Sequence, residues 1–127
     1  MPPSAAKPQV LVVEDEALLL FSISDELKEA GFEVFEAVNA DEAIRQLDLH
    51  QGIGLVFTDI DMPGSMDGLR LSAVIRDRWP PVKIIITSGQ LRPDARQLPV
   101  EGVFLPKPYT TSGVLAAMQS MLDQTSP

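Results

Sequence analysis

The chain has 127 residues, a length that fits one domain with a single substantial core. Hydrophobic residues make up 45% of the sequence and charged residues 22%, a composition typical of a folded, soluble protein. The 18 acidic residues outnumber the 10 basic ones, and the net charge of −8 argues against direct binding to nucleic acid or to an anionic membrane. The absence of cysteine excludes disulfides and thiolate metal sites.

The first residues, MPPSAAKPQ, contain one lysine and no apolar stretch, so they do not resemble a signal peptide. No apolar run reaches the length of a membrane span, and we therefore expect a cytoplasmic protein. Residues 1–7 are predicted to form a flexible tail, residues 8–123 a single domain and residues 124–127 a C-terminal tail.

Short apolar runs, several of them rich in β-branched residues, predict five β-strands. The second run alternates apolar and polar residues, which indicates a strand near the edge of a sheet, whereas the third is apolar enough to be buried on both faces. The predicted strands cover residues 10–13, 32–38, 54–59, 82–88 and 102–106.

Apolar residues at helical spacing predict helices between these strands. Gly31 is a predicted helix stop, and Asn39 with Glu42 resembles a capping arrangement at a helix start. The segment 89–100 contains two prolines and little periodicity, so we expect a short or distorted helix there. The other predicted helices cover residues 16–30, about 40–49 and 67–79, and a last helix follows Thr110 as its cap.

Strands that alternate with helices predict an α/β fold, in which helices cover both faces of a parallel sheet. Right-handed crossovers favour a doubly wound (βα)5, flavodoxin-like arrangement with five parallel strands in the order 2-1-3-4-5. Ligands of such folds bind beyond the carboxyl ends of the strands, where the strand order reverses. Functional side chains are therefore expected at that edge.

Acids, hydroxyls and a lysine occupy these strand ends, at Glu14, Asp15, Asp59, Thr87, Ser88 and Lys107. Two carboxylates about 4 Å apart repel each other by roughly 4 kcal/mol at an effective dielectric constant of about 20, so several in one pocket demand a cation. Oxygen ligands without His or Cys favour Mg²⁺. A nucleophilic carboxylate, a hydroxyl and an ammonium beside Mg²⁺ are the parts of a phosphoryl-transfer site.

The stretches VLVVEDE, VFTDIDMPGSMDGL, IIITSG and FLPKPY occur in this order and spacing. Together they resemble the receiver domain of a bacterial two-component response regulator, and the resemblance covers about residues 8–123. It implies that Asp59 accepts a phosphoryl group. It also implies an Mg²⁺ site in which Asp15 is a direct ligand and Glu14 acts mainly through water, completed by Asp59 and the backbone carbonyl of Asp61.

The resemblance further implies which residues bind the phosphoryl group and respond to it. Thr87 resembles the switch hydroxyl and Lys107 the phosphate-binding lysine, with Ser88 as a third phosphate-binding residue. Phe104 resembles the aromatic residue whose rotamer follows phosphorylation. Pro108 resembles the proline after the lysine, which in the family often follows a cis peptide bond.

The sequence departs from the family pattern in three places. The loop MPGSMDG is one residue longer than the commonest form, and Tyr109 stands where phenylalanine is usual. The prolines of residues 89–100 lie in the region through which many receivers dimerise. We therefore predict a monomer or a weak homodimer.

These residues predict a phosphoacceptor signalling domain and not an enzyme, with Mg²⁺-dependent self-phosphorylation and self-dephosphorylation as its only chemistry. The resemblance implies a histidine kinase or a histidine phosphotransfer protein as phosphoryl donor, and a change in partner binding as the response. Few residues follow the last predicted helix, so an output protein in trans is expected. No direct contact with nucleic acid or with a membrane is expected.

Two alternative functions use the same residues. The first is a phosphatase of the haloacid-dehalogenase type, because Asp59 and Asp61 form an Asp-x-Asp motif and Lys107 could supply its lysine. That motif belongs on the first strand of such enzymes, however, and here it lies on the third, which also leaves Glu14 and Asp15 without a role. The second alternative is a receiver-like interaction module in which phosphorylation is not used.

Overall fold

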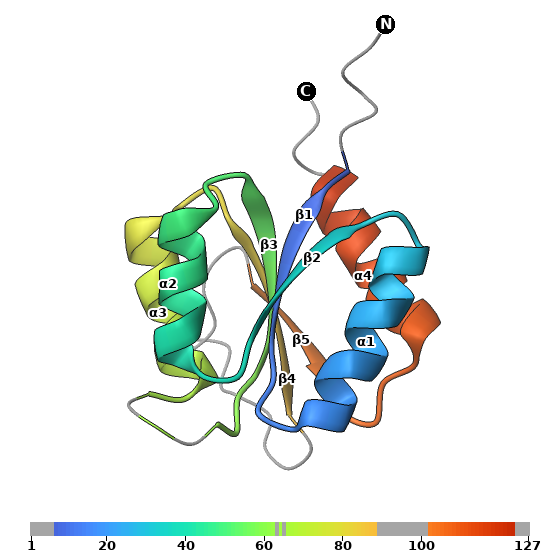
Figure 1. The fold of residues 1–127 in the computed structure, drawn as a ribbon, viewed down its shortest axis with the longest axis horizontal. Coiled ribbons are helices and arrows are strands. Elements are labelled where there is room, and N and C mark those ends of the chain that lie inside the picture. Colours follow the sequence, from blue (N-terminus) through green and yellow to red (C-terminus); the bar gives the residue numbers. More distant parts are fainter. Residues whose placement is uncertain (1–6, 63, 65, 89–101, 124–127) are drawn as a thin grey trace, which may run out of the picture.

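The computed structural model describes residues 7–62, 64, 66–88 and 102–123 (Figure 1). The bounds of the predicted strands, and of the helices predicted over residues 16–30, 40–49 and 67–79, agree with the structure to within one residue. The predicted short or distorted helix in residues 89–100 and most of both predicted tails lie outside the described residues. The elements are β1 (Gln9–Val13), α1 (Ala17–Glu29), β2 (Glu33–Ala37), α2 (Ala40–Leu49), β3 (Ile53–Asp59), α3 (Gly68–Arg78), β4 (Lys83–Ser88), β5 (Gly102–Pro106) and α4 (Thr111–Asp123).

The strands form one sheet in the order β2-β1-β3-β4-β5, and each neighbouring pair is parallel. Helices α2 and α3 cover one face of the sheet, and α1 and α4 cover the other (Figure 1). This confirms the predicted doubly wound, flavodoxin-like fold. β2 lies on one side of β1, and β3, β4 and β5 follow on the other side, so the strand order reverses between β1 and β3. The carboxyl ends of these two strands therefore border the expected binding edge.

The core consists of two apolar clusters, one on each face of the sheet. Leu11 and Val13 of β1 enter the cluster under α2 and α3, whereas Val10 and Val12 enter the cluster under α1 and α4. Because both faces of the central strands are covered, successive residues are buried, which explains their continuous apolar sequence. The edge strand β2 is partly exposed, in agreement with its alternating sequence.

The helix ends follow local signals in the sequence. The side chain of Asn39 accepts a hydrogen bond from the N–H of Glu42 at 2.8 Å, and the carboxylate of Glu42 accepts one from the N–H of Val38 at 3.1 Å. Gly31 follows α1 with φ of 102°, a conformation that glycine adopts without strain. Thr110 accepts a backbone N–H from the first turn of α4, so the predicted caps are confirmed.

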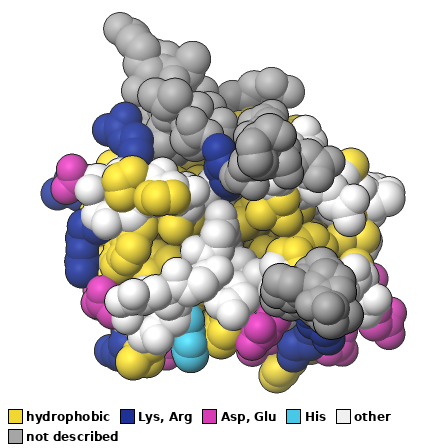
Figure 2. Space-filling view, turned by 90° about the horizontal axis from the view of Figure 1, so that it is seen from above, with side chains coloured by type: hydrophobic (Ala, Val, Ile, Leu, Met, Phe, Trp, Pro, Cys, Tyr) yellow, Lys and Arg dark blue, Asp and Glu magenta, His cyan; other side chains and the backbone are white. Residues whose placement is uncertain are grey.

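Figure 2 views the end of the molecule at which the strands begin. Hydrophobic side chains are visible there between polar ones, and charges of both signs lie around the rim. Within the described ranges, no helix has the length and the apolar character that crossing a bilayer requires. The polar residues singled out in the sequence lie at the other end of the sheet.

Candidate functional site

The carboxyl ends of β1, β3, β4 and β5 bring the candidate residues together. Asp59 closes β3 and lies beside Thr87 in the register of β3 with β4. Glu14 directly follows β1, and its N–H donates to the carbonyl of Ala37, while Lys107 directly follows β5. Residues that are distant in sequence therefore share one pocket because parallel strands end at the same edge.

The shortest polar contact in this pocket joins Lys107 and Asp59. The Nζ atom of Lys107 lies 2.8 Å from Oδ2 of Asp59 and 3.9 Å from Oε1 of Glu14. Only 4% of Asp59 is exposed, so this charged hydrogen bond is largely shielded from water. Burial by itself lowers the pKa of Lys107, but the hydrogen bond and the negative charge of Asp59 outweigh it and raise the pKa above its usual value. The lysine therefore remains an ammonium.

Asp59 also belongs to a group of three carboxylates. Glu14, Asp15 and Asp59 each offer an oxygen, and these oxygens lie within 4.8 Å of one another. Burial raises the pKa of Glu14 to about 6, and the charge of Asp59 adds to the rise, although a hydrogen bond from the N–H of Glu16 opposes it. One ammonium cannot balance three carboxylates, so the pocket lacks positive charge. Its donors are all hard oxygens, a set that fits Mg²⁺.

The hydroxyl of Thr87 is a buried polar group in the part of the sheet next to Asp59. Its Oγ1 atom makes no hydrogen bond to any described residue, although the side chain is almost completely buried. An unsatisfied buried hydroxyl costs about 1–3 kcal/mol. Its position beside Asp59 in the register of the sheet suits an oxygen-rich ligand bound at that carboxylate.

Asp61 takes part in the site through its backbone and its side chain. Its N–H donates to Oδ1 of Asp59 at 3.1 Å, and its own Oδ2 accepts from the hydroxyl of Ser88 at 3.2 Å. The first bond orients the Asp59 carboxylate, and the second ties the loop after β3 to the end of β4. The sequence analysis did not foresee either contact, and the predicted role of the Asp61 carbonyl stays a prediction.

Phe104 lies on β5, and Lys107, Pro108 and Tyr109 follow that strand. Phe104 is partly buried and packs against the apolar cluster under α2 and α3. The peptide bond between Lys107 and Pro108 is cis, the form that the resemblance implied. The ring of Tyr109 meets that of Phe57 edge to face, with centroids 5.4 Å apart. The pocket is thus fixed on one side by the core.

Comparison with known proteins decides the family. The pattern of the family described as "Response regulator receiver domain" matches residues 10–119. The chain belongs to this family. The receiver domain is also 30% identical over 125 residues to the transcriptional regulatory protein PrrA of Mycobacterium tuberculosis, a match that covers 96% of this chain and 53% of PrrA. It is also 37% identical over 81 residues to the response regulator protein FleR of Pseudomonas aeruginosa. This match covers 64% of this chain and 17% of FleR.

A solved structure supports the same assignment. The crystal structure of a response regulator receiver protein from Sinorhizobium medicae superposes with a TM-score of 0.85 at 29% identity, covering 92% of this chain and 95% of that one. The chain is thus a response regulator receiver domain of a two-component system, and nothing in these comparisons supports the haloacid-dehalogenase alternative. The chain spans about half the length, or less, of the curated relatives named above.

Gly68 is a site residue that the sequence analysis missed. It begins α3 close to the backbone of Asp59, and its N–H donates to the carbonyl of Ile60 at 3.0 Å. A Cβ at this position would lie 2.1 Å from the backbone oxygen of Asp59 and 2.8 Å from Cα of Ile60. The signal in the sequence was a glycine directly after the helix cap Asp67.

Gly68→Ala is expected to destabilise the receiver domain by about 2 kcal/mol or more, because backbone atoms of β3 would have to move away from the new methyl group. Chemical denaturation of wild type and variant measures this difference in the free energy of unfolding. Gly54→Ala on β3 is the matched control, since a Cβ there meets no atom within 4 Å. Equal stability of the two variants would contradict the close approach of α3 to Asp59.

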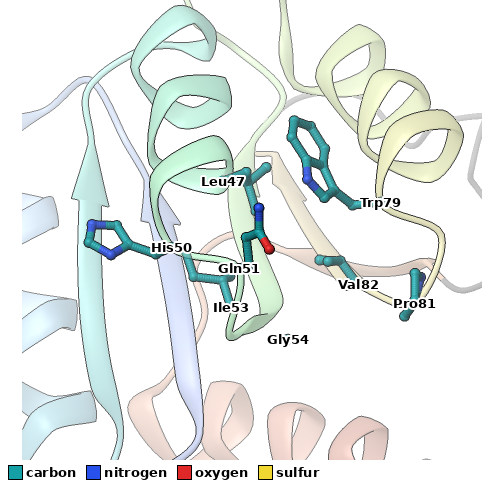
Figure 3. A pocket seen from close by; sticks show the side chains of 8 residues that line it. All are labelled: Leu47, His50, Gln51, Ile53, Gly54, Trp79, Pro81 and Val82. Carbon is teal, nitrogen blue, oxygen red and sulfur yellow. The ribbon is translucent and has the colours of Figure 1, made fainter.

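A hollow lies at the opposite end of the sheet and is separate from the acidic pocket. Its volume is about 150 Å³, and it lies where α2 and α3 end and β3 and β4 begin. Figure 3 shows the Trp79 and Leu47 side chains on one side of it, Gln51 between the helices, and the His50 ring directed away. His50 instead stacks on Phe35 with ring centroids 4.1 Å apart. Within the described ranges, no carboxylate or ammonium lines this hollow, so these residues do not suit the chemistry of the acidic pocket.

Proposed function

We propose that this receiver domain accepts a phosphoryl group on Asp59 and changes its binding to a partner in response. The observation that carries the proposal is the contact between Lys107 and Asp59 beside a buried Thr87 hydroxyl that has no hydrogen-bond partner among the described residues. A phosphoryl group on Asp59 would give both groups an anionic oxygen to bind. The ammonium would neutralise charge on that group, and the hydroxyl would donate a hydrogen bond.

Mg²⁺ is the proposed cofactor of this reaction. The side chains of Glu14, Asp15 and Asp59 would hold the ion, with the backbone carbonyl of Asp61 as a further ligand. When bound, the ion supplies positive charge to phosphoryl oxygens. The acidic group of this chain supports the assignment because its oxygens lie within 4.8 Å of one another and the ammonium of Lys107 offsets only part of their negative charge.

The proposed response begins at the phosphoryl oxygens. Thr87 would turn its hydroxyl toward them, and Ser88, whose hydroxyl donates to Asp61 in this structure, is the third proposed phosphate-binding residue. Phe104 of β5 lies opposite Ile86 of β4, and Ile86 directly precedes Thr87 in that strand. A movement of β4 at Thr87 would therefore reach the Phe104 ring, and through it the surface beside β5.

The proposed donor is a histidine kinase or a histidine phosphotransfer protein. Helix α1 offers an apolar surface for such a partner beside the acidic pocket, because 84% of Leu18 and 62% of Phe21 are exposed. Exposed large apolar side chains of this kind are typical of interaction sites. A cytoplasmic location and an output through a separate or a linked protein complete the proposal.

Incubation with acetyl phosphate and Mg²⁺ tests this function. We expect the incorporation of about one phosphoryl group per chain, in a form that hydroxylamine removes, as it does for acyl phosphates. Intact-protein mass spectrometry measures the product. Steady release of phosphate over many turnovers would favour the phosphatase alternative instead. A complete failure to incorporate phosphoryl would favour the interaction module that does not use phosphorylation.

A further inference from the structure

The hollow at the opposite end of the sheet has a wall from which a side chain is missing. Its volume is about 150 Å³, and Gly54 of β3 lines it. A Cβ at Gly54 would meet no atom of the described residues within 4 Å, so open space lies where another residue would carry its side chain. Leu47 and Ile53, which also line the hollow, are buried in the core. The hollow is therefore preformed, as ligand sites usually are.

The backbone at Gly54 departs from regular strand pairing. Gln9 of β1 lies opposite Ile53, and Val10 lies opposite Leu55, so Gly54 is left over as a bulge. Bulges are retained features of a fold and are common next to functional sites. A glycine inside a strand weakens that strand, and it often marks a place where a ligand approaches the backbone. No described part of the chain itself makes this approach to Gly54, which leaves the space to a ligand.

The size and shape of the hollow favour a small, flat molecule. A dry apolar cavity of roughly 150 Å³ holds one benzene ring. The indole of Trp79 forms one wall, and Leu47, Pro81 and Val82 add apolar surface (Figure 3). Aromatic rings pack favourably against an indole, so a flat ring gains more here than an aliphatic ring of similar size. Gln51 lies between the two helices and offers its amide to a polar group of the ligand (Figure 3).

The charges around the hollow favour a neutral ligand. Helices α2 and α3 both end here, and the partial negative charge of their C-termini disfavours an anion. The guanidinium of Arg78 lies 4.4 Å from the centroid of the Trp79 ring and 3.2 Å from the carboxylate of Asp48. One face of the ring therefore already has its cation, and the nearby carboxylate has its partner. The last carbonyls of a helix accept hydrogen bonds, which favours a ligand with an O–H or N–H donor.

We propose that this hollow binds a small, uncharged aromatic molecule with one hydrogen-bond donor, of the size of phenol or indole. Its ring occupies the open space at Gly54 and packs against Trp79, and its donor lies near Gln51. The acidic pocket lies at the other end of the same strands. Binding in the hollow does not depend on phosphorylation of Asp59, so it goes beyond the proposed function.

Phenol is the probe, and Trp79, the only tryptophan of the chain, supplies the signal. NMR titration is expected to show saturable shifts of the indole N–H of Trp79 and of the amide of Gly54. Benzoate and benzylammonium carry a charge on the same ring, and each is expected to bind at least about tenfold more weakly than phenol. Cyclohexanol keeps the hydroxyl without a flat ring and is expected to bind about fivefold more weakly. Equal binding of all four compounds would contradict the proposed ligand class.

Gly54→Val fills the hollow without removing a contact, and it is expected to weaken phenol binding at least about tenfold. Gly54→Ala adds one methyl group and is expected to have a smaller effect in the same direction. Open space surrounds the position, so both variants are expected to fold, which circular dichroism checks. Leu49→Ala is the matched control, because Leu49 ends α2, is 67% exposed and does not line the hollow. It is expected to bind phenol like the wild type.

Two results would overturn the site. The first is unchanged phenol affinity in both Gly54 variants, or an equal loss in Leu49→Ala, which would indicate non-specific binding to apolar surface. The second is occupation of the hollow by a side chain from another copy of the chain. Sedimentation velocity would then show a wild-type dimer that Gly54→Val dissociates, and phenol would not shift the Trp79 resonance.

Discussion

Asp59→Asn is expected to reduce phosphoryl incorporation from acetyl phosphate by at least about 10³-fold, because a neutral amide is a far poorer nucleophile than a carboxylate. The substitution keeps the size of the side chain and the backbone of β3. The N–H of Asp61, which donates to Oδ1 of Asp59, would keep an acceptor in the amide oxygen. Loss of labelling would therefore report on the chemistry of the residue and not on its packing.

The variant also changes the charge of the pocket. It removes the closest anionic partner of Lys107 and one of three crowded carboxylates. These effects oppose each other, so the free energy of unfolding is expected to change by less than about 2 kcal/mol. Circular dichroism during chemical denaturation measures it, and intact mass measures labelling.

Asp48→Asn is a suitable control, since Asp48 pairs with Arg78 on the surface of α2 and α3. It removes one acid from the chain without touching the pocket. Wild-type labelling of this variant is expected. If Asp59→Asn were labelled to the same extent as Asp48→Asn, the assignment of the phosphoacceptor would be wrong.

Removal of divalent metal is the second prediction with a large effect. Chelation by EDTA is expected to abolish labelling by acetyl phosphate, because the incoming anion would otherwise meet Glu14, Asp15 and Asp59 with one ammonium among them. Metal ions stabilise developing phosphoryl charge by several kcal/mol, which corresponds to about 10³-fold in rate. Labelling is expected to return when Mg²⁺ is added in excess over the chelator.

Asp15→Asn tests the origin of this requirement within the chain. Asp15 is the exposed member of the acidic group and follows β1 next to the buried Glu14. Its substitution is expected to weaken Mg²⁺ binding at least about tenfold, because a full negative charge at the ion is lost. Isothermal titration calorimetry with Mg²⁺ measures this without a phosphoryl donor. Unchanged Mg²⁺ affinity, or labelling that persists in EDTA, would contradict the proposed metal site.

The two predictions separate the nucleophile from its electrostatic surroundings. Asp59→Asn removes the attacking atom whether or not Mg²⁺ is present. Chelation leaves that atom in place and removes the charge that lets an anion approach it.

Local patterns were sufficient to predict the fold. The continuous apolar sequence of β1 and β3 reflects burial on both faces, and the alternation in β2 reflects its place at the edge. Caps such as Asn39 were readable because a cap acts on residues only three positions away. The strand order of the structure then agrees with the order that right-handed crossovers favoured.

The sequence by itself also determined which residues would share the pocket. Glu14, Asp59, Thr87 and Lys107 follow or end strands, and parallel strands end at one edge of a sheet whatever their loops do. Convergence of this kind requires only the order of the strands. The identity of the acidic group was thus predictable from the positions of the strand ends.

Only the tertiary structure decided how these residues meet. The pairing of Lys107 with Asp59 joins positions 48 residues apart, and it depends on the register of β4 with its two neighbours. The bond from Ser88 to Asp61, the closeness of Gly68 to the Asp59 backbone and the hollow at Gly54 depend on distances of a few ångströms between separate elements. Sequence patterns fix the faces and ends of helices and strands, whereas such distances arise when all elements pack together.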